Sequence, residues 1–321
     1  DPPEGSAGSF FWDQTVLPWI AWRRGAALVF SPANFGPIAM GRRSILLLRN
    51  TFVAAESCRT AGARFRWWSM EWMSRASVKA ARGGLIVSES FRRDIATRFG
   101  VPEESLAVVH HGRSGIFGPE PREGDGAGAG PSPYVLIVAD IYPHKNLVAA
   151  VEAFARAAAS RTDVRLVLAG AELKPAYAAE VRARIADLGI GDRVAFLGSR
   201  PQAELPGLYR GAVAVLNPSL AETFGITQVE AMACGAPLVA SDIPVGREIC
   251  GDAALLVSPT DVAAMAAALE RVLGDASLRA ELSRKGIERS AEFTWDRTAA
   301  RLHEEVLRRL AELGVATASS A

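Results

Sequence analysis

Short apolar runs alternate with longer stretches of helical period along most of the chain. Apolar runs bounded by Gly, Pro or polar residues predict buried strands, and the stretches between them predict helices. Strands that alternate with helices favour an α/β fold, in which helices cover both faces of a parallel sheet. The expected strands are 26–31, 44–50, 85–88, 106–110, 134–139, 164–169, 194–198, 212–216, 237–241 and 253–257. The expected helices are 11–24, 64–82, 90–99, 147–160, 177–189, 204–210, 226–234, 261–273, 278–293 and 294–313.

A Gly- and Pro-rich stretch divides this pattern in two. Residues 118–133 read GPEPREGDGAGAGPSP and lack an apolar period, which is typical of a linker. The glycines do not fit G-x-G-x-x-G and precede a strand instead of following one, so a dinucleotide-binding dehydrogenase is disfavoured. We therefore expect an N-terminal domain over 1–117, a C-terminal domain over 134–295, and a last helix with a tail over 296–321.

Composition narrows the functional class. The chain has 321 residues, 49% hydrophobic and 22% charged, which suits a soluble globular protein with two domains of ~150 residues each. A net charge of +1 gives no overall field that would attract nucleic acid. Cys58, Cys234 and Cys250 are scattered, which argues against a disulfide framework or a zinc site. They favour a reducing compartment, so we expect a cytoplasmic protein.

Neither a membrane span nor a signal peptide is expected. No apolar run reaches the ~18 residues of a transmembrane helix. The N-terminal sequence DPPEGSAGSF has no basic segment followed by an apolar core. Because the chain does not begin with Met, we expect it to be processed, trimmed or a fragment.

The chemistry is concentrated in residues 212–241, AVAVLNPSLAETFGITQVEAMACGAPLVAS. An apolar strand, a loop, a short helix and a second strand predict a βαβ unit with a short crossover. Glu222 lies before the helix and Glu230 in its second turn, and Gly225 stands at the helix start. Free N–H groups and the helix dipole favour an anion there. Two carboxylates beside an anion site suit a nucleotide sugar, whereas the alternative is a surface helix with two solvated acids.

This block resembles the EX7E motif of retaining GT-B glycosyltransferases, most closely family GT4. The matching residues are Glu222, Phe224, Gly225, Glu230, Ala231 and Gly235-Ala236-Pro237. The resemblance implies that Glu222 contacts hydroxyls of the donor sugar and that Glu230 contacts the ribose. It also implies that backbone N–H groups after Gly225, at Ile226 and Thr227, meet the diphosphate.

Lys145 is the second expected anchor, because it follows a buried strand and precedes a helix. Ligands of open α/β sheets bind at such strand ends, and a Lys supplies a point charge for phosphate. The alternative is a Lys at a helix start with a free side chain. The segment PHKN resembles a subset of GT4 enzymes, but Asp140 stands where most of the family has a second phosphate-binding Arg. Arg200 is the candidate replacement for that Arg.

Two glycines end strands at the same expected sheet edge. Gly198 follows Phe196-Leu197, and the resemblance implies that the loop after it meets the nucleobase. Gly170 ends the preceding strand and permits close approach of a ligand. For both, turn geometry alone is the competing explanation.

The helix over 64–82 carries Trp67, Trp68 and Trp72 among basic residues. Trp68 and Trp72 lie four residues apart on one face, which favours core packing, and Trp67 is then the exposed ring. The sharper alternative is an acceptor-facing or membrane-facing surface, since a basic aromatic helix attracts anionic headgroups.

Other reaction classes lack their motifs. His110 and His111 are adjacent on a strand and point to opposite faces, so a shared metal is not expected. His303-Glu304-Glu305 is not H-E-x-x-H, and no G-x-S-x-G indicates a hydrolase. No Asp-x-Asp pair occurs, which disfavours a metal-dependent GT-A transferase.

The resemblance implies a GT-B-like α/β protein with two Rossmann-like domains facing across a cleft. The N-terminal domain looks truncated, because the family's first βα units and their Gly-rich loop are missing. The last helix, with an apolar stripe of Ala299, Leu302, Val306, Leu310 and Leu313, is expected to cross back onto that domain.

The expected activity is metal-independent, retaining transfer of a hexose-like sugar from a nucleotide diphosphate sugar, as in polysaccharide biosynthesis. Glu222 and Lys145 are the expected catalytic residues. The acceptor is expected to be a glycan, a lipid-linked molecule or a small molecule, with peripheral membrane contact as the alternative location. The rival function is a non-catalytic partner subunit that binds the nucleotide sugar.

Overall fold

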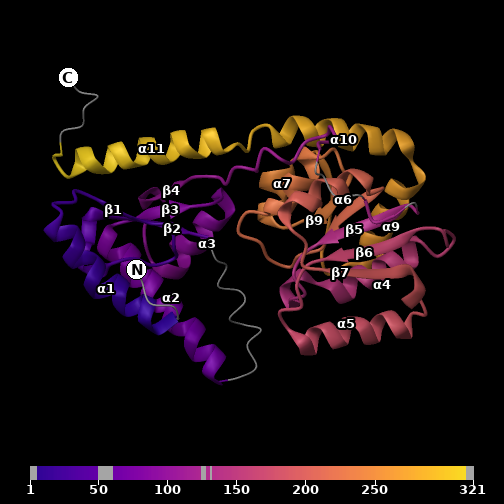
Figure 1. Ribbon diagram of the computed structural model, residues 1–321, viewed down its shortest axis with the longest axis horizontal. Helices are drawn as coiled ribbons and strands as arrows, with labels where there is room; N and C mark the ends of the chain where they lie inside the picture. Colours follow the sequence, from indigo (N-terminus) through magenta and orange to yellow (C-terminus); the bar gives the residue numbers. More distant parts are fainter. Residues whose placement is uncertain (1–5, 50–60, 124–127, 131, 316–321) are drawn as a thin grey trace. The chain divides into compact units, whose positions relative to one another are not determined.

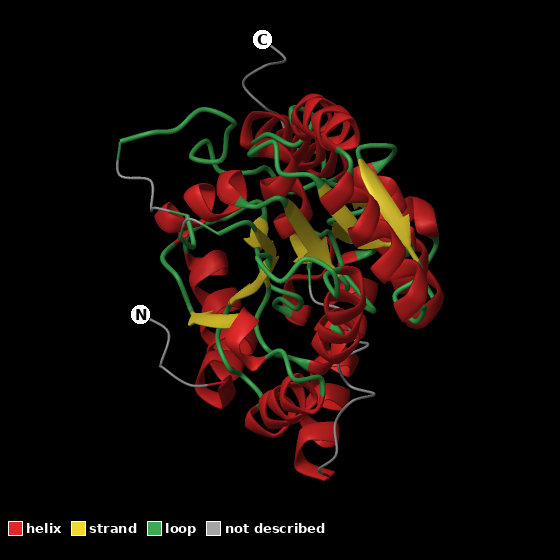
Figure 2. Ribbon diagram, turned by 90° about the vertical axis from the view of Figure 1, so that its right-hand side faces the viewer, coloured by secondary structure: helices red, strands yellow, loops and turns green. Residues whose placement is uncertain are grey.

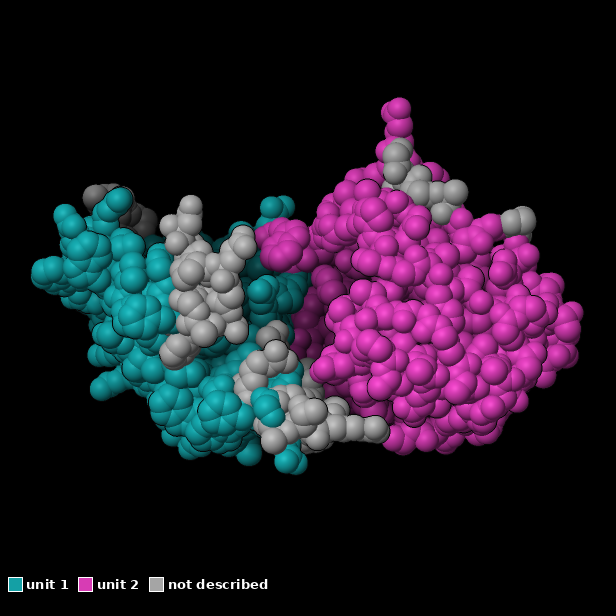
Figure 3. All heavy atoms as spheres, turned by 60° about the horizontal axis from the view of Figure 1, so that its bottom comes forward, with its two compact units in different colours: residues 1–111, 296–321 teal, residues 112–295 magenta. Residues whose placement is uncertain are grey.

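A computed structural model of the chain describes residues 6–49, 61–123, 128–130 and 132–315. The chain forms two compact units, coloured separately in Figure 3. Unit 1 comprises Asp1–His111 with Asp296–Ala321, and unit 2 comprises Gly112–Trp295. Parts of the expected linker (124–127 and 131), Cys58 and the tail 316–321 lie outside the described residues.

Unit 1 contains a sheet of four parallel strands in the order β1-β2-β3-β4 (Figure 1). The strands are β1 (Val29–Ser31), β2 (Ser44–Leu48), β3 (Gly84–Ile86) and β4 (Leu106–Val108). Its helices are α1 (Ser6–Arg23), α2 (Ala61–Ala81), α3 (Glu89–Phe99) and α11 (Trp295–Glu312), with short 3-10 segments η1 (Ile38–Arg43) and η3 (Glu103–Ser105).

Local sequence fixes the ends of α3. The Ser88 hydroxyl accepts a hydrogen bond from the Phe91 N–H at 3.2 Å, which satisfies a free donor of the first turn. Gly100 ends the helix in the left-handed conformation, with φ of 60°. Phe91 and Phe99 are buried between these caps, so one face of α3 covers the sheet.

Helix α11 packs on the sheet of unit 1 with only part of its expected apolar stripe. Leu302 and Val306 contact a small core that contains Ile45, Leu85 and Val109. Ala299, by contrast, is exposed.

Two charged residues of α11 are buried, although charged side chains are rarely found inside a protein. These are Glu305 and Arg309. The Arg309 guanidinium donates to the Ala81 carbonyl at 2.8 Å, at the end of α2, and Glu305 pairs with Arg301 and Arg308. A helix C-terminus has carbonyls without helical partners, so a buried Arg is well placed there.

Unit 2 contains a sheet of six parallel strands in the order β10-β9-β8-β5-β6-β7. The strands are β5 (Tyr134–Val138), β6 (Arg165–Ala169), β7 (Val194–Gly198), β8 (Ala214–Asn217), β9 (Leu238–Ser241) and β10 (Ala254–Val257). The helices are α4 (Leu147–Ala157), α5 (Pro175–Asp187), α6 (Leu205–Gly211), α7 (Ile226–Ala233), α8 (Pro244–Cys250), α9 (Val262–Gly274) and α10 (Ala276–Ser290), with 3-10 segments η4 (Pro143–Lys145), η5 (Gly191–Arg193) and η6 (Gln202–Glu204).

The strand order of unit 2 creates a switch point. From β5 the chain moves outward through β6 and β7, then returns to the other side of β5 for β8, β9 and β10. Connections after β5 and β8 therefore diverge to opposite sides at the carboxyl ends of these neighbouring strands. Open α/β sheets bind ligands at such points.

A hydrophobic core supports this edge of the sheet. Leu147, Val151 and Phe154 recur at helical spacing on α4 and are fully buried. On α9, Met265 and Leu269 complete the same core, and Figure 2 shows helices on either side of the strands. Strands of a sheet that is covered on both faces are continuous apolar runs, and this is why the sequence predicted them.

The expected α/β class with parallel sheets is confirmed, but the expected core packing of two tryptophans is wrong. Trp68 and Trp72 are exposed, and Trp67, expected to be the exposed ring, is partly buried. Among the described residues, no helix combines the length and apolarity that a membrane crossing requires.

Candidate functional site

The predicted site residues gather at the carboxyl edge of the unit 2 sheet. Lys145 ends η4, directly after β5, and Glu222 lies in the loop after β8. Because β5 and β8 are hydrogen-bonded neighbours, the switch point brings together two residues that are 77 positions apart. Gly170 directly follows β6 and Gly198 ends β7, both at the same edge.

Lys145 and Glu222 form a short ion pair. The Lys145 ammonium donates to Glu222 Oε1 at 2.6 Å, and the side chains are only 20% and 13% exposed. The Ser219 hydroxyl donates to the same oxygen at 2.8 Å. Lys145 is therefore not a free side chain at a helix start. The two partners hold the carboxylate in one orientation at the carboxyl edge of the sheet.

Asn146 ties together the loops that carry this pair. It adopts a left-handed conformation, with φ of 56°, which Asn tolerates better than most residues. Its side-chain amide donates to the carbonyls of Pro218 at 3.2 Å and Pro259 at 2.7 Å. The Leu220 N–H donates to the His144 carbonyl at 2.8 Å. The loops after β5, β8 and β10 are thereby fastened to one another.

Helix α7 begins four residues after Glu222, and no side chain caps its N-terminus. Gly225 precedes it with φ of 84°, and a Cβ there would lie 2.5 Å from Gln228 Oε1. The Asn217 amide donates to the Thr227 hydroxyl at 3.1 Å and accepts from Gln228 Nε2 at 3.2 Å. Hydrogen bonds between Asn217 and the side chains of Thr227 and Gln228 thus fix the first turn of α7. Its first backbone N–H groups have no side-chain cap and are suited to bind an anion.

The side chains of Phe224 and Ile226 have different surroundings. Phe224 is buried and meets Phe293 edge to face, with ring centroids 5.6 Å apart. Ile226, at the first position of α7, is exposed. The aromatic ring of Phe224 therefore holds the loop to the rest of unit 2. A ligand in this site would contact the backbone of Phe224, not its side chain.

Glu230 is buried, in contrast to the solvated acid that a surface helix would carry. The Tyr209 hydroxyl donates to Glu230 Oε2 at 3.2 Å. Burial raises the pKa of Glu230 to about 7, although hydrogen bonds from Tyr209 and Gln202 favour the charged form. Burial also raises the pKa of Tyr209, with the nearby Glu230 adding to the effect.

Tyr209 and Gln202 were not identified from the sequence. They belong to α6 and η6, which precede β8, and the chain carries no periodic signal that pairs them with Glu230. Only the packing of α6 against α7 brings them to that carboxyl group. A buried partner of this kind follows from tertiary structure alone.

His144 is a further group beside the ion pair. Burial lowers the pKa of His144, the Lys145 ammonium lowers it further, and Glu222 opposes both. Its Nδ1 atom is buried and has no hydrogen-bond partner in the described part of the chain. Its ring lies 4.9 Å from that of Tyr142. The imidazole therefore sits next to the charged pair, where burial favours its neutral form.

Asp140 and Gly170 have structural reasons for their identity. The Asp140 carboxylate accepts a hydrogen bond from the Ala171 N–H at 2.8 Å, so it fastens the loop after β6. A Cβ on Gly170 would lie 2.0 Å from the Ala139 carbonyl oxygen, which only glycine avoids. Gly198 has φ of 68° and open space around it. Close backbone packing thus explains Gly170, and turn geometry explains Gly198.

Arg200 is not placed as a partner of Lys145. It forms an ion pair with Glu204 four residues later, on the surface of unit 2. That contact satisfies the guanidinium locally.

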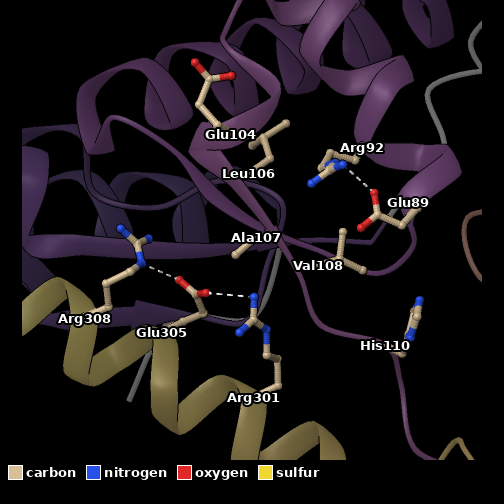
Figure 4. Close-up of a pocket in the computed structure, with 10 residues that line it drawn as sticks. All are labelled: Glu89, Arg92, Glu104, Leu106, Ala107, Val108, His110, Arg301, Glu305 and Arg308. Carbon is tan, nitrogen blue, oxygen red and sulfur yellow. Dashed lines mark hydrogen bonds and ion pairs between the residues drawn. The ribbon is translucent and has the colours of Figure 1, made fainter.

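The described residues hold no group of three or more His, Cys, Asp or Glu side chains arranged to bind a metal ion. A separate pocket of about 390 Å³ lies in unit 1 (Figure 4). There Glu305 bridges Arg301 and Arg308, and Arg92 pairs with Glu89. None of the residues predicted to bind the donor lines this pocket.

Comparison with known proteins places this geometry in a family. A family model described as "Glycosyl transferases group 1" matches residues 125–289. The chain is 29% identical over 259 residues to the O-antigen chain mannosyltransferase RfbU of Salmonella typhimurium, which covers 79% of this chain and 68% of that protein. It is 32% identical over 245 residues to the D-inositol 3-phosphate glycosyltransferase of Acidothermus cellulolyticus, which covers 70% of this chain and 53% of that protein.

Solved structures agree in fold. Anabaena Alr3699/HepE, crystallised in complex with UDP and glucose, superposes with a TM-score of 0.72 at 18% identity and covers 97% of this chain and 84% of that chain. Sucrose-phosphate synthase from Thermosynechococcus elongatus gives a TM-score of 0.71 at 22% identity, and covers 92% and 77%. The two curated relatives are longer, and this chain spans about half to two thirds of them.

Proposed function

Since the chain belongs to the group 1 glycosyl transferases, we propose that it transfers a sugar with retention from a nucleotide diphosphate sugar to a glycan, lipid-linked or small-molecule acceptor. One observation carries the proposal. The 2.6 Å Lys145–Glu222 pair stands at the switch point between β5 and β8, next in sequence to the uncapped start of α7. At one edge of the sheet, a cation and helix N–H groups suit the diphosphate of such a donor, and a carboxylate suits its sugar hydroxyls.

Each part of the donor has a proposed partner. The Lys145 ammonium and the N–H groups of Ile226 and Thr227 stabilise the diphosphate as it leaves with negative charge. Glu222, once its ammonium partner turns to phosphate, accepts hydrogen bonds from sugar hydroxyls and orients the ring. Glu230 accepts from the ribose hydroxyls with the carboxyl oxygen that Tyr209 does not occupy.

The reaction needs no further protein base in this proposal. The acceptor hydroxyl attacks from the face that the diphosphate leaves, and a leaving phosphate oxygen takes its proton. The new glycosidic bond forms as the bond from the sugar to the phosphate breaks, so configuration is retained. Lys145 and the α7 N–H groups supply the positive charge, and we propose that no metal ion takes part.

The nucleobase is proposed to lie by the ends of β6 and β7. Gly198 leaves space for backbone contacts there, because nothing lies within 4 Å of its Cβ position, whereas Gly170 lets the loops after β5 and β6 pack closely beside it. Because the Anabaena structure was solved with UDP and glucose, UDP-sugars are the first donors to test. Arg200 reaches the phosphates in this proposal only if it leaves Glu204.

The acceptor class follows from what the relatives act on. One is named for an O-antigen chain and one for an inositol phosphate. We propose that unit 1 supplies the acceptor side and makes peripheral contact with a cytoplasmic membrane surface. The exposed aromatic side chains of α1 support that contact. Nucleic acid is not a proposed partner.

Donor binding and turnover test the proposal separately. A thermal-shift panel of UDP-, GDP- and ADP-sugars should identify one nucleotide that stabilises the chain by about 2.7 kcal/mol at a hundredfold excess over its Kd. The stabilising donor should then be hydrolysed slowly or transferred to an acceptor. Binding without any turnover would favour the rival function, a non-catalytic partner subunit, and no stabilisation by any nucleotide would contradict both.

A further inference from the structure

Helix α1 of unit 1 exposes large aromatic side chains on one face. Phe11, Trp19 and Trp22 are 65%, 53% and 76% exposed. Together with the exposed Thr15, their spacing places them along one side of the helix. Scattered exposed apolar residues need no explanation, but rings gathered on one face mark an interaction surface.

The opposite side of α1 is anchored to the unit. Gln14 donates from Nε2 to the Gly36 carbonyl at 2.9 Å and accepts from the Ile38 N–H at 3.1 Å. Ala21 is buried, and the Ala26 N–H donates to its carbonyl at 2.9 Å just after the helix ends. These contacts fix the rotation of α1, so its aromatic face is held outward.

A pocket of about 920 Å³ lies beside this face. It runs between α1, η1 and the last residues after α11, and its charged groups belong to Arg42 and Arg43. No Asp or Glu lines it among the described residues. The apolar lining consists of Pro18, Trp19, Ala21, Trp22, Ala26, Ala27, Ala39, Met40, Leu313 and Val315.

Four arginines surround the aromatic surface. Arg23 ends α1 and Arg24 follows it, and Arg42 and Arg43 end η1; all are exposed. The Arg23 guanidinium lies 4.9 Å from the centre of the Trp19 ring. Aromatic rings that point outward between guanidinium groups are typical of proteins that lie on a membrane, where rings enter the headgroup region and cations meet phosphates.

We propose that this surface, which we call the α1–η1 face (Phe11, Trp19, Trp22, Arg23, Arg24, Arg42 and Arg43), docks on a bilayer that contains anionic phospholipid. The proposal deepens the peripheral membrane contact of the proposed function and does not depend on turnover. A neutral glycan fits less well, because the described lining of the pocket offers no carboxylate to accept hydrogen bonds from hydroxyls. A second copy of the chain would bring two sets of four arginines together.

Vesicle co-sedimentation of the full chain tests the assignment. We expect binding to vesicles of phosphatidylcholine with phosphatidylglycerol, weaker binding as salt rises, and little binding to phosphatidylcholine alone. Trp19→Ala with Trp22→Ala, and separately Arg42→Glu with Arg43→Glu, should each reduce the partition coefficient at least about tenfold. Trp68→Ala with Trp72→Ala is the matched control on α2 and should change it less than about twofold.

Several results would overturn the proposal. These are absence of binding to anionic vesicles, equal binding to both kinds of vesicle, or loss of binding in the α2 pair with retention in the α1 pair. Dimers of the parent chain that dissociate in the Trp19→Ala, Trp22→Ala variant would show that a second copy covers the face. Nucleotide-induced thermal shifts, measured on the same variants, should stay unchanged, so a failed donor site would be seen independently.

Discussion

At the scale of single residues, Glu230 is the group whose protonation should be visible in stability. Its pKa is about 7 in the folded chain because it is buried, against an ordinary value of 4.5. The folded state therefore holds the proton more tightly than the unfolded state between these values. Stability from this group is complete below pH 4.5 and is lost as pH rises through 7. At ~1.4 kcal/mol per pKa unit, the loss is at most about 3–4 kcal/mol.

Glu230→Gln removes this titration and keeps the shape of the side chain. We expect the free energy of unfolding to become flatter with pH between 4.5 and 7, and to exceed that of the parent at pH 8. Urea unfolding at a series of pH values measures it. Glu180→Gln, on the exposed side of α5, is the matched control and should leave the slope of the parent. An unaltered slope in Glu230→Gln would mean that another group titrates there.

At the scale of elements, the segment after β4 packs tightly against the end of α10. The Arg113 N–H donates to the Phe293 carbonyl at 3.0 Å, and residue 113 pairs with Thr294 as a parallel bridge. A Cβ on Gly112 would lie 2.2 Å from the Trp295 backbone nitrogen. The nearest atoms belong to the backbone of Thr294 and Trp295, so no side chain could turn aside to make room for the added Cβ.

Gly112→Ala should therefore destabilise unit 2 by about 1–3 kcal/mol, as overpacking against backbone does. Gly115→Ala is the matched control, because a Cβ there has nothing within 4 Å and the backbone is not in the left-handed region. Chemical denaturation of both variants measures the difference. Equal stability of the two would show that the 112–117 segment can separate from residues 290–295 at little cost.

Helix α11 gives a second prediction at this scale. Leu302 and Val306 cover the small core of unit 1, and Arg309 caps the end of α2. Deletion of residues 296–321 should expose that core and make unit 1 sensitive to proteolysis, while nucleotide still stabilises unit 2. Limited proteolysis with and without nucleotide measures both, and deletion of 316–321 alone is the control. Resistance of unit 1 in the longer deletion would contradict a packing role for α11.

At the scale of the whole molecule, the sequence indicated most strands and helices because buried parallel strands are continuous apolar runs. It missed α8, in which Gly246 stands mid-helix because a Cβ would lie 2.3 Å from the Ser241 carbonyl oxygen. It also gave no signal that Glu305 of α11 is buried, since charged residues are normally exposed. Tertiary packing decides such cases, and no period in the chain records it.

The site was predicted in the same uneven way. Lys145 and Glu222 follow apolar strands and could be assigned to one sheet edge, and the structure joins them at 2.6 Å. The partner of Glu230 could not be foreseen, because Tyr209 reaches it only through the packing of α6 on α7. Arg200 was chosen as a replacement for a missing cation, yet it pairs with Glu204. The position of residues at strand ends can thus be predicted from the sequence, whereas contacts between helices cannot.

The central claim is that Lys145 stabilises the leaving diphosphate at the switch point between β5 and β8. The most direct test is the rate of transfer or donor hydrolysis at saturating donor by Lys145→Ala, with Lys174→Ala as the control cation in the same unit. The account predicts at least a hundredfold lower kcat for Lys145→Ala, as removal of a group that stabilises transition-state charge does, and parent-like turnover for Lys174→Ala. Parent-like turnover by Lys145→Ala would contradict it.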